Sequence, residues 1–160
     1  MSVRYGRVCP DLQRSLQEIV RRIVELESQG LFMQAEEERA DDDAYRVEKQ
    51  LRKLQVAKQG DDRDLTEAKL WLSSIAQGRG DPGLHDTAGR TKRARGMIQL
   101  ISRSLLRRCA EGHQLNEKRV ELRAREEACE LAGYELAEAL KAIQSDLVAA
   151  VTAGISASGL

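Results

Sequence analysis

A stripe of mainly apolar residues runs through residues 12–54 at alternating spacings of four and three. A seven-residue repeat with two apolar positions forms one narrow side of an α-helix, as in coiled coils. The stripe keeps its phase across two exceptions, Gly30 and Glu37, so we expect one helix over about 11–59. At ~1.5 Å per residue such a helix is roughly 70 Å long, and it needs a partner along its length. The positions of this first stripe are Leu12, Leu16, Ile19, Ile23, Leu26, Gly30, Met33, Glu37, Ala40, Ala44, Val47, Leu51 and Leu54.

The pattern is interrupted at Gly60, which two aspartates follow. Glycine commonly ends a helix and aspartate commonly caps the next one, so we expect the first helix to end at about residue 59. Residues 63–77 then predict a short helix with Trp71 beside its apolar side. That side is formed by Leu65, Ala68 or Lys69, Leu72 and Ile75. The glycines around Pro82 predict a loop over about 78–89.

A second stripe with the same spacing predicts another long helix, over about 91–151. We expect residues 1–9 to form a loose arm and residues 152–160 to form a frayed tail. The positions of the second stripe are Ile98, Ile101, Leu105, Arg108, Gly112, Leu115, Arg119, Leu122, Glu126, Cys129, Gly133, Leu136, Leu140, Ile143, Leu147 and Ala150.

The two stripes are of similar length and are separated by the short helix and the loop. This order predicts an all-α protein in which the stripes pack against each other in a long antiparallel helical hairpin, a coiled coil. The short third helix is expected to pack near the turn end. We therefore expect residues 1–160 to form a single helical domain.

Charged residues within the stripes provide a hypothesis about the register of the hairpin. If facing residues have numbers that sum to about 156, Glu37 faces Arg119, and the acidic residues around Glu37 lie opposite basic ones. Such a pair adds little stability but disfavours other registers, because a slip leaves a charge without its partner. In the alternative, both side chains extend out of the stripe to solvent on their aliphatic stems.

The composition is that of long helices and not of a compact globule. Charged residues make up 32% of the 160 residues and aromatic residues only 3%. Lys plus Arg and Asp plus Glu both number 26, so the net charge indicates no partner. Three widely spaced cysteines, Cys9, Cys109 and Cys129, form no disulfide framework. Without a secretory signal or a stretch of ~20 apolar residues, we expect a cytoplasmic protein with no membrane segment.

Groups with catalytic or metal-binding potential are few. Cys109, His113 and Glu117 lie one turn apart on the predicted helix, but zinc sites use three or four ligands, usually from several segments. His85 lies near Asp81 and Asp86 in the glycine-rich loop, where a solvated turn is the simpler interpretation. The chain has no phosphate-binding loop and no nucleophile motif. We therefore expect no enzyme, no cofactor and no metal.

The positive charges are unevenly distributed and indicate an anion-binding segment. Residues 90–108 carry seven basic residues and no acid. The expected hairpin places residues 49–58 beside them, so that one end is basic and can contact the phosphates of duplex nucleic acid. The alternative is a solvated helical face. The basic residues are Arg90, Lys92, Arg93, Arg95, Arg103, Arg107 and Arg108, with Lys49, Arg52, Lys53 and Lys58.

The function expected from these features is a non-enzymatic coiled-coil scaffold or adaptor that binds protein partners, including further copies of itself. Nucleic-acid binding through the basic end is the alternative. In length, charge content and its two long helical segments, the chain resembles the small antiparallel coiled-coil stalk proteins of bacterial type III and flagellar export machines. The predicted short helix with Trp71 is not a feature of the simplest two-helix stalk.

Overall fold

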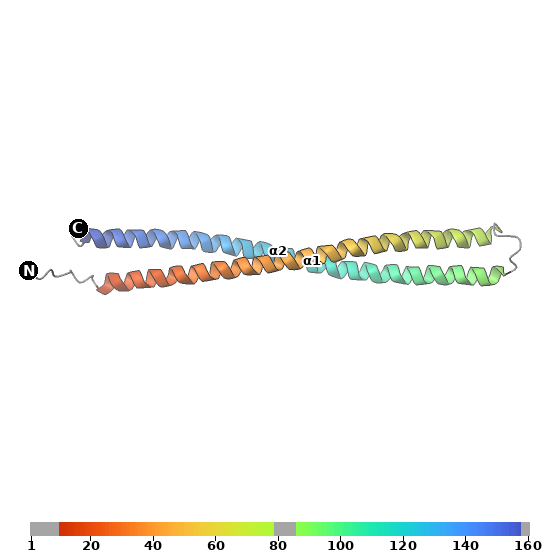
Figure 1. The fold of residues 1–160 in the computed structure, drawn as a ribbon, viewed down its shortest axis with the longest axis horizontal. Helices are drawn as coiled ribbons and strands as arrows, with labels where there is room; N and C mark the ends of the chain where they lie inside the picture. The colour runs from red at the N-terminus through yellow and green to blue at the C-terminus, as the bar shows by residue number, and fades with distance from the viewer. Residues whose placement is uncertain (1–9, 79–85, 158–160) are drawn as a thin grey trace, which may run out of the picture. The chain divides into compact units, whose positions relative to one another are not determined.

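The structure, a computed structural model, describes residues 10–78 and 86–157 and contains two long helices (Figure 1). Helix α1 spans Pro10–Ala76 and helix α2 spans Thr87–Ala157. The described part of the chain has no strand, so the all-α prediction is confirmed. The predicted N-terminal arm, the loop residues Asp81 and His85, and residues 158–160 of the predicted tail lie outside the described residues.

Helix α1 continues through Gly60, so the predicted break at residue 59 and the separate short helix over 63–77 are wrong. The stripe explains this continuity. From Leu54 the same spacing continues through Lys58 and Asp61 into the apolar positions of the supposed short helix, without a change of phase. An interior glycine costs about 1 kcal/mol relative to alanine. That cost is small compared with breaking a stripe whose later positions, such as Ala68 and Ile75, are buried.

Local capping sets the two helix ends near the turn. Gly78 adopts φ 67°, the left-handed conformation that glycine tolerates, and its N–H donates to the carbonyl of Ile75 at 3.2 Å. Asp86 caps α2, because its Oδ1 accepts from the N–H of Gly89 at 2.9 Å. Helix α2 thus begins before the predicted residue 91, and it extends beyond residue 151 into the segment that was predicted to fray.

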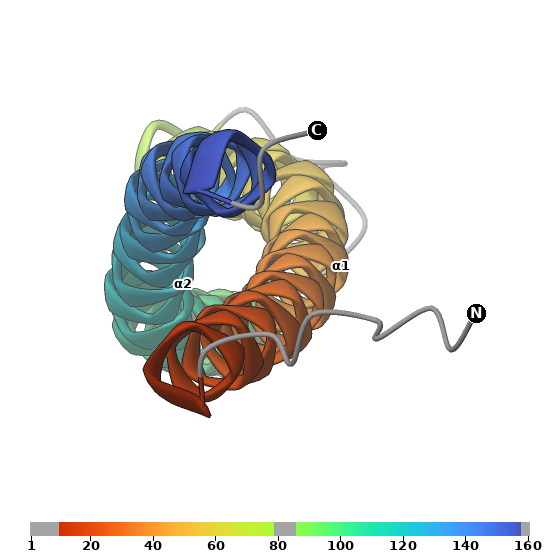
Figure 2. The same ribbon diagram turned by 90° about the vertical axis from the view of Figure 1, so that its left-hand side faces the viewer.

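The chain divides into two compact units, each built from one part of α1 and one part of α2. Unit 1 contains α1 up to Asp42 and α2 from Arg123 onward, and unit 2 contains residues 43–122. Within each unit the two helical segments run antiparallel. Figure 2 turns the view so that the unit 1 ends of the helices, red for α1 and blue for α2, face the viewer.

Both stripes form the contact faces of the helices, which confirms this part of the prediction. Every position of the first and second stripes is buried or half-buried. The most deeply buried residues are small or medium-sized, as Ala44 and Ala94 show with no exposed surface. Most of the larger leucines and isoleucines stay half-buried, because two helices cover only one side of each other. The buried apolar residues are Leu26, Ala40, Ala44, Val47, Leu54, Ala68, Ile75 and Ala94.

The register of the helices differs from the one expected from charge. Asp41 would face Leu115 in that register, but its Oδ1 accepts from Nη1 of Arg123 at 2.7 Å in unit 1. The shift is about eight residues, slightly more than one heptad. Glu37 and Arg119 belong to different units, and Arg119 donates to the side chain of Asn116 at 2.7 Å.

Complementary side-chain size accounts for the observed register. A Cβ placed on Gly112 in unit 2 would lie 3.2 Å from Cδ2 of Leu54. In unit 1 a Cβ on Gly154 would lie 2.8 Å from Cδ2 of Leu12. Each leucine thus packs over a glycine of the other helix, and a slip would put larger side chains in those places and create voids elsewhere.

Replacing Gly60 with alanine should stabilise the protein by about 1 kcal/mol, because an interior helical glycine loses more conformational entropy than alanine. No atom lies within 4 Å of a Cβ built at Gly60, so the added methyl group meets no neighbour. Urea unfolding followed by far-UV circular dichroism measures the change. Gly78→Ala is the matched control and should destabilise, because Gly78 has a positive φ. A loss of stability in Gly60→Ala would contradict a continuous α1.

Candidate interaction surfaces

Nine large apolar side chains in the described part of unit 1 are exposed, and six of them each come directly after a position of a contact stripe. Three of these six are on α1 and three on α2, with exposures between 43% for Val151 and 70% for Tyr134. Scattered exposed apolar residues are ordinary, but a row of them marks a contact surface. We call this set the apolar face of unit 1. Its residues are Val20, Val24, Leu31, Tyr134, Val148 and Val151.

The spacing of these residues places them on one side of each helix. Val20, Val24 and Leu31 are four and seven residues apart, so they share one face of α1. The spacing from Ala137 is three residues to Tyr134, eleven to Val148 and fourteen to Val151. These spacings place all four residues on one face of α2. Leu31 and Ala137 line the same groove between the helices, so the two rows border one side of unit 1.

The groove has a volume of about 390 Å³. Gly30 on α1 and Gly133 on α2 lie in it, and a Cβ built on either glycine would meet nothing within 4 Å. The two missing side chains leave a gap in the contact between the helices, and leucines surround that gap. Such a gap can accept a side chain from another helix. The groove is lined by Leu26, Glu27, Gly30, Leu31, Gln34, Gly133, Leu136, Ala137 and Leu140.

Ion pairs flank the contact between the helices at one end of unit 1. We call it the acidic end, because it contains the acidic residues around Glu37. Glu36, whose side chain is only 13% exposed, accepts from Arg125 at 2.6 Å. Arg123 bridges Asp41 of α1 at 2.7 Å and Glu126 of its own helix at 2.6 Å. The predicted opposition of the acidic run to basic residues of α2 is thus present, but in the shifted register. These contacts orient the helices and add a modest amount of stability.

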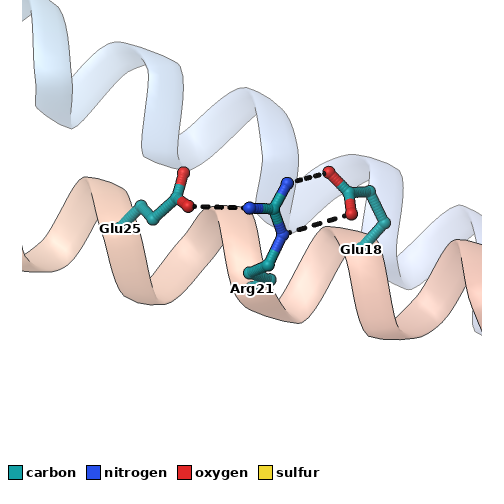
Figure 3. Close-up of polar contacts among 3 residues, drawn as sticks. All are labelled: Glu18, Arg21 and Glu25. Atoms are coloured by element: carbon teal, nitrogen blue, oxygen red, sulfur yellow. Dashed lines mark hydrogen bonds and ion pairs between the residues drawn. The ribbon is translucent and has the colours of Figure 1, made fainter.

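A further cluster of charges in unit 1 pairs within α1. Arg21 on α1 contacts Glu18 at 2.5 Å and Glu25 at 3.1 Å (Figure 3). The hydrogen bond from Arg21 lowers the pKa of the Glu18 carboxyl, and the same contact raises the pKa of Arg21. The side chains of Glu18 and Arg21 are each 62% exposed and that of Glu25 is 43% exposed, so this cluster is solvated and contributes little to stability.

Unit 2 contains a polar cluster within the contact between its helices. Oδ2 of Asp61 accepts from the hydroxyl of Ser104 at 2.9 Å and from Nε of Arg108 at 2.8 Å. The Asp61 side chain is 17% exposed and that of Arg108 is 35% exposed. Asp61, predicted to cap a new helix, therefore instead joins α1 to α2 in the middle of the stripe. Its carboxylate is thereby paired with a partly buried arginine of the other helix.

The structure separates Lys49, Arg52 and Lys53 from the basic segment of α2, whereas Lys58 lines a groove with Cys109, next to Arg108. One groove of unit 2 is lined by Leu51 and Leu54 of α1 and by Gly112 and Arg119 of α2. Lys49, Arg52 and Lys53 lie next to these two leucines in the sequence. The α1 segment beside residues 90–108 is instead the later one that contains Asp64 and Glu67.

Only some of the predicted basic residues are available to a ligand. Arg108 is engaged by Asp61, and Arg93 contacts the carbonyl of Gly89 at 3.4 Å and Asp86 at 4.0 Å. Arg52 lies over the Tyr45 ring, 5.9 Å from its centroid. Arg90 is half-buried. The other predicted basic residues with exposed side chains are Lys49, Lys53, Lys92, Arg95, Arg103 and Arg107.

The residues considered for metal or acid–base chemistry do not gather into a site. His113 contacts Glu117 at 3.1 Å, and Cys109 is exposed one turn earlier. Among residues 10–78 and 86–157, no group of three or more potential ligands could hold a metal ion. Asp86 serves as a helix cap.

Comparisons with known proteins add no family to this description. The sequence matches no protein-family model, and searches of curated proteins and of solved structures gave no match. Neither of the two described helices is apolar enough over a sufficient length to cross a membrane.

Asp61→Ala should lower the free energy of unfolding by about 1 kcal/mol, because it leaves the partly buried Arg108 and Ser104 without their shared acceptor. Asp61→Asn keeps an acceptor oxygen and should cost less. Asp62→Ala is the matched control, since Asp62 is exposed, and should change the stability by less than ~0.5 kcal/mol. Urea unfolding of the three variants tests this order. Equal effects at Asp61 and Asp62 would show that the cluster does not stabilise unit 2.

Proposed function

We propose that this protein is a non-enzymatic coiled-coil scaffold or adaptor that binds protein partners through the apolar face of unit 1. The supporting observation is the alignment of six exposed apolar side chains on one side of two packed helices, around a groove that two glycines leave open. Two antiparallel helices cannot cover this face themselves, and a third or fourth helix packed there would bury it.

Further support comes from how the charges are distributed. The ion pairs at the acidic end of unit 1 flank the contact between the helices, whereas the apolar face carries few charged residues. Interfaces between proteins have this arrangement, with an apolar centre and a polar rim. The continuous α1 also removes the separate Trp71 helix, the one predicted feature by which the chain departed from the simplest two-helix stalk proteins.

Binding of nucleic acid is the second candidate. It is supported by the exposure of Lys92, Arg95, Arg103 and Arg107 along one segment of α2. The acids of the neighbouring α1 segment weaken this positive field, and Asp61 already holds Arg108. The scaffold function therefore has the stronger support.

A photo-crosslinking amino acid at Val24 or Tyr134 should capture defined protein partners in cells, and mass spectrometry identifies the products. Gln29 and Ala139 are matched control positions, because both are exposed but point to the other side of their helices. Captured products should be several-fold more abundant at the apolar face than at the controls. Equal yields at all four positions would contradict the proposed surface.

Charge reversal at Arg95, Arg103 and Arg107 separates the two candidates. A scaffold that uses the apolar face keeps its crosslinked partners in this triple variant. A nucleic-acid binder loses its ligand, and its affinity falls steeply as salt is added. Gel-shift titration with duplex RNA and DNA at two salt concentrations measures this. Tight, salt-sensitive binding that the triple variant abolishes would favour the second candidate.

A further inference from the structure

We infer that the apolar face of unit 1 is occupied by the same face of a second copy of this chain, in a two-fold symmetric pair. This inference rests on the proposed function and names the partner of the same surface. It is drawn from the positions of apolar and charged side chains along the common axis of the two helices. We call the position of a residue along this axis its height.

The contacts in unit 1 establish which residues of α1 and α2 lie at the same height. Leu12 packs over Gly154 near one end, and Asp41 binds Arg123 near the other. Between these points Leu31 lies level with Tyr134. Val20 lies within about one turn, ~5 Å, of the height of Val148, and Glu27 lies equally close to the height of Lys141.

A two-fold axis parallel to the helices places α1 of one copy on α2 of the other without any shift along the axis. Leu31 then meets Tyr134 of the second copy, and Val20 meets Val148. Between these apolar contacts, Glu27 meets Lys141 of the second copy, so the charges at the interface attract each other. All neighbouring helices in the resulting four-helix arrangement are antiparallel, which is the usual arrangement in such bundles.

This match favours a second copy over an unrelated protein. A symmetric interface uses one surface twice, so each row on α1 must complement the row at the same height on α2. An interface with an unrelated protein would not require the exposed side chains of α1 to complement those of α2. Here Leu31 lies level with Tyr134, and within one turn Val20 matches Val148 and Glu27 has the opposite charge to Lys141, while Val24 lies level with Lys141.

The available area is close to what a stable pair needs. Six apolar side chains that each expose on the order of 100 Å² offer roughly 600 Å² per copy. Standard interfaces bury ~800 Å² per partner, of which the rim is polar. Glu27, Gln34 and Lys141 lie among these apolar side chains and add polar area to the interface. The open groove at Gly30 and Gly133 can receive a side chain of the other copy.

Light scattering coupled to size exclusion, with the full chain at up to ~100 μM, should give twice the mass of one chain. Glu27→Lys and Lys141→Glu should each raise the dissociation constant at least about tenfold, because each variant creates two like-charge contacts per pair. Mixing the two variants should restore the pair, since every contact in the mixed pair joins a lysine to a glutamate. Restoration by mixing cannot come from a change within one chain.

Val24→Asp provides a second, independent variant, because Val24 is 56% exposed and its replacement leaves the helices intact. It should yield a single-chain mass with unchanged circular dichroism, whereas Gln29→Asp on the other side should leave the pair intact. A single-chain mass for the unaltered protein overturns the inference, and so does a pair that mixing fails to restore. In either case crosslinks from Val24 to a different protein would still support the proposed scaffold.

Discussion

The contact between two narrow stripes is the constraint on which the rest of this structure depends. A helix with two apolar positions in seven can bury them only against another helix with the same spacing. Each part of α1 thus depends on the part of α2 beside it, and each interruption of the spacing weakens both helices. Continuity of phase therefore overrides local signals, and the Gly-Asp-Asp sequence at residues 60–62 lies within a helix.

The contact faces could be predicted from the sequence, because periodicity records directly which side of a helix is apolar. Both stripes are buried or half-buried at every position that the spacing indicated. The helix boundaries could be predicted less well, because Gly60 and the aspartates after it are also typical of a helix end. The decisive signal was present in the sequence, since Leu54, Lys58, Asp61 and Leu65 continue the same alternation of four and three.

The register was beyond what the charges could predict. A repeat of seven offers several registers in which apolar positions still meet, and flanking acids and bases are numerous enough to find partners in more than one of them. Differences in side-chain size select among these registers. Leu12 lies over Gly154 and Leu54 lies over Gly112, where a built Cβ would come within 3.2 Å of the leucine. Asp61 with Ser104 and Arg108 adds a polar contact between the helices in the observed register.

The register in turn determines the candidate surface. The rows containing Val20 and Val148 are each visible in the sequence, but a row on one helix defines no surface until the other helix is placed beside it. In the register expected from charge, Leu31 would lie level with Arg125, and the apolar face would be divided by charge. In the observed register it lies level with Tyr134. The packing of large residues over glycines therefore aligns the helices and also brings six apolar side chains together on one side of unit 1.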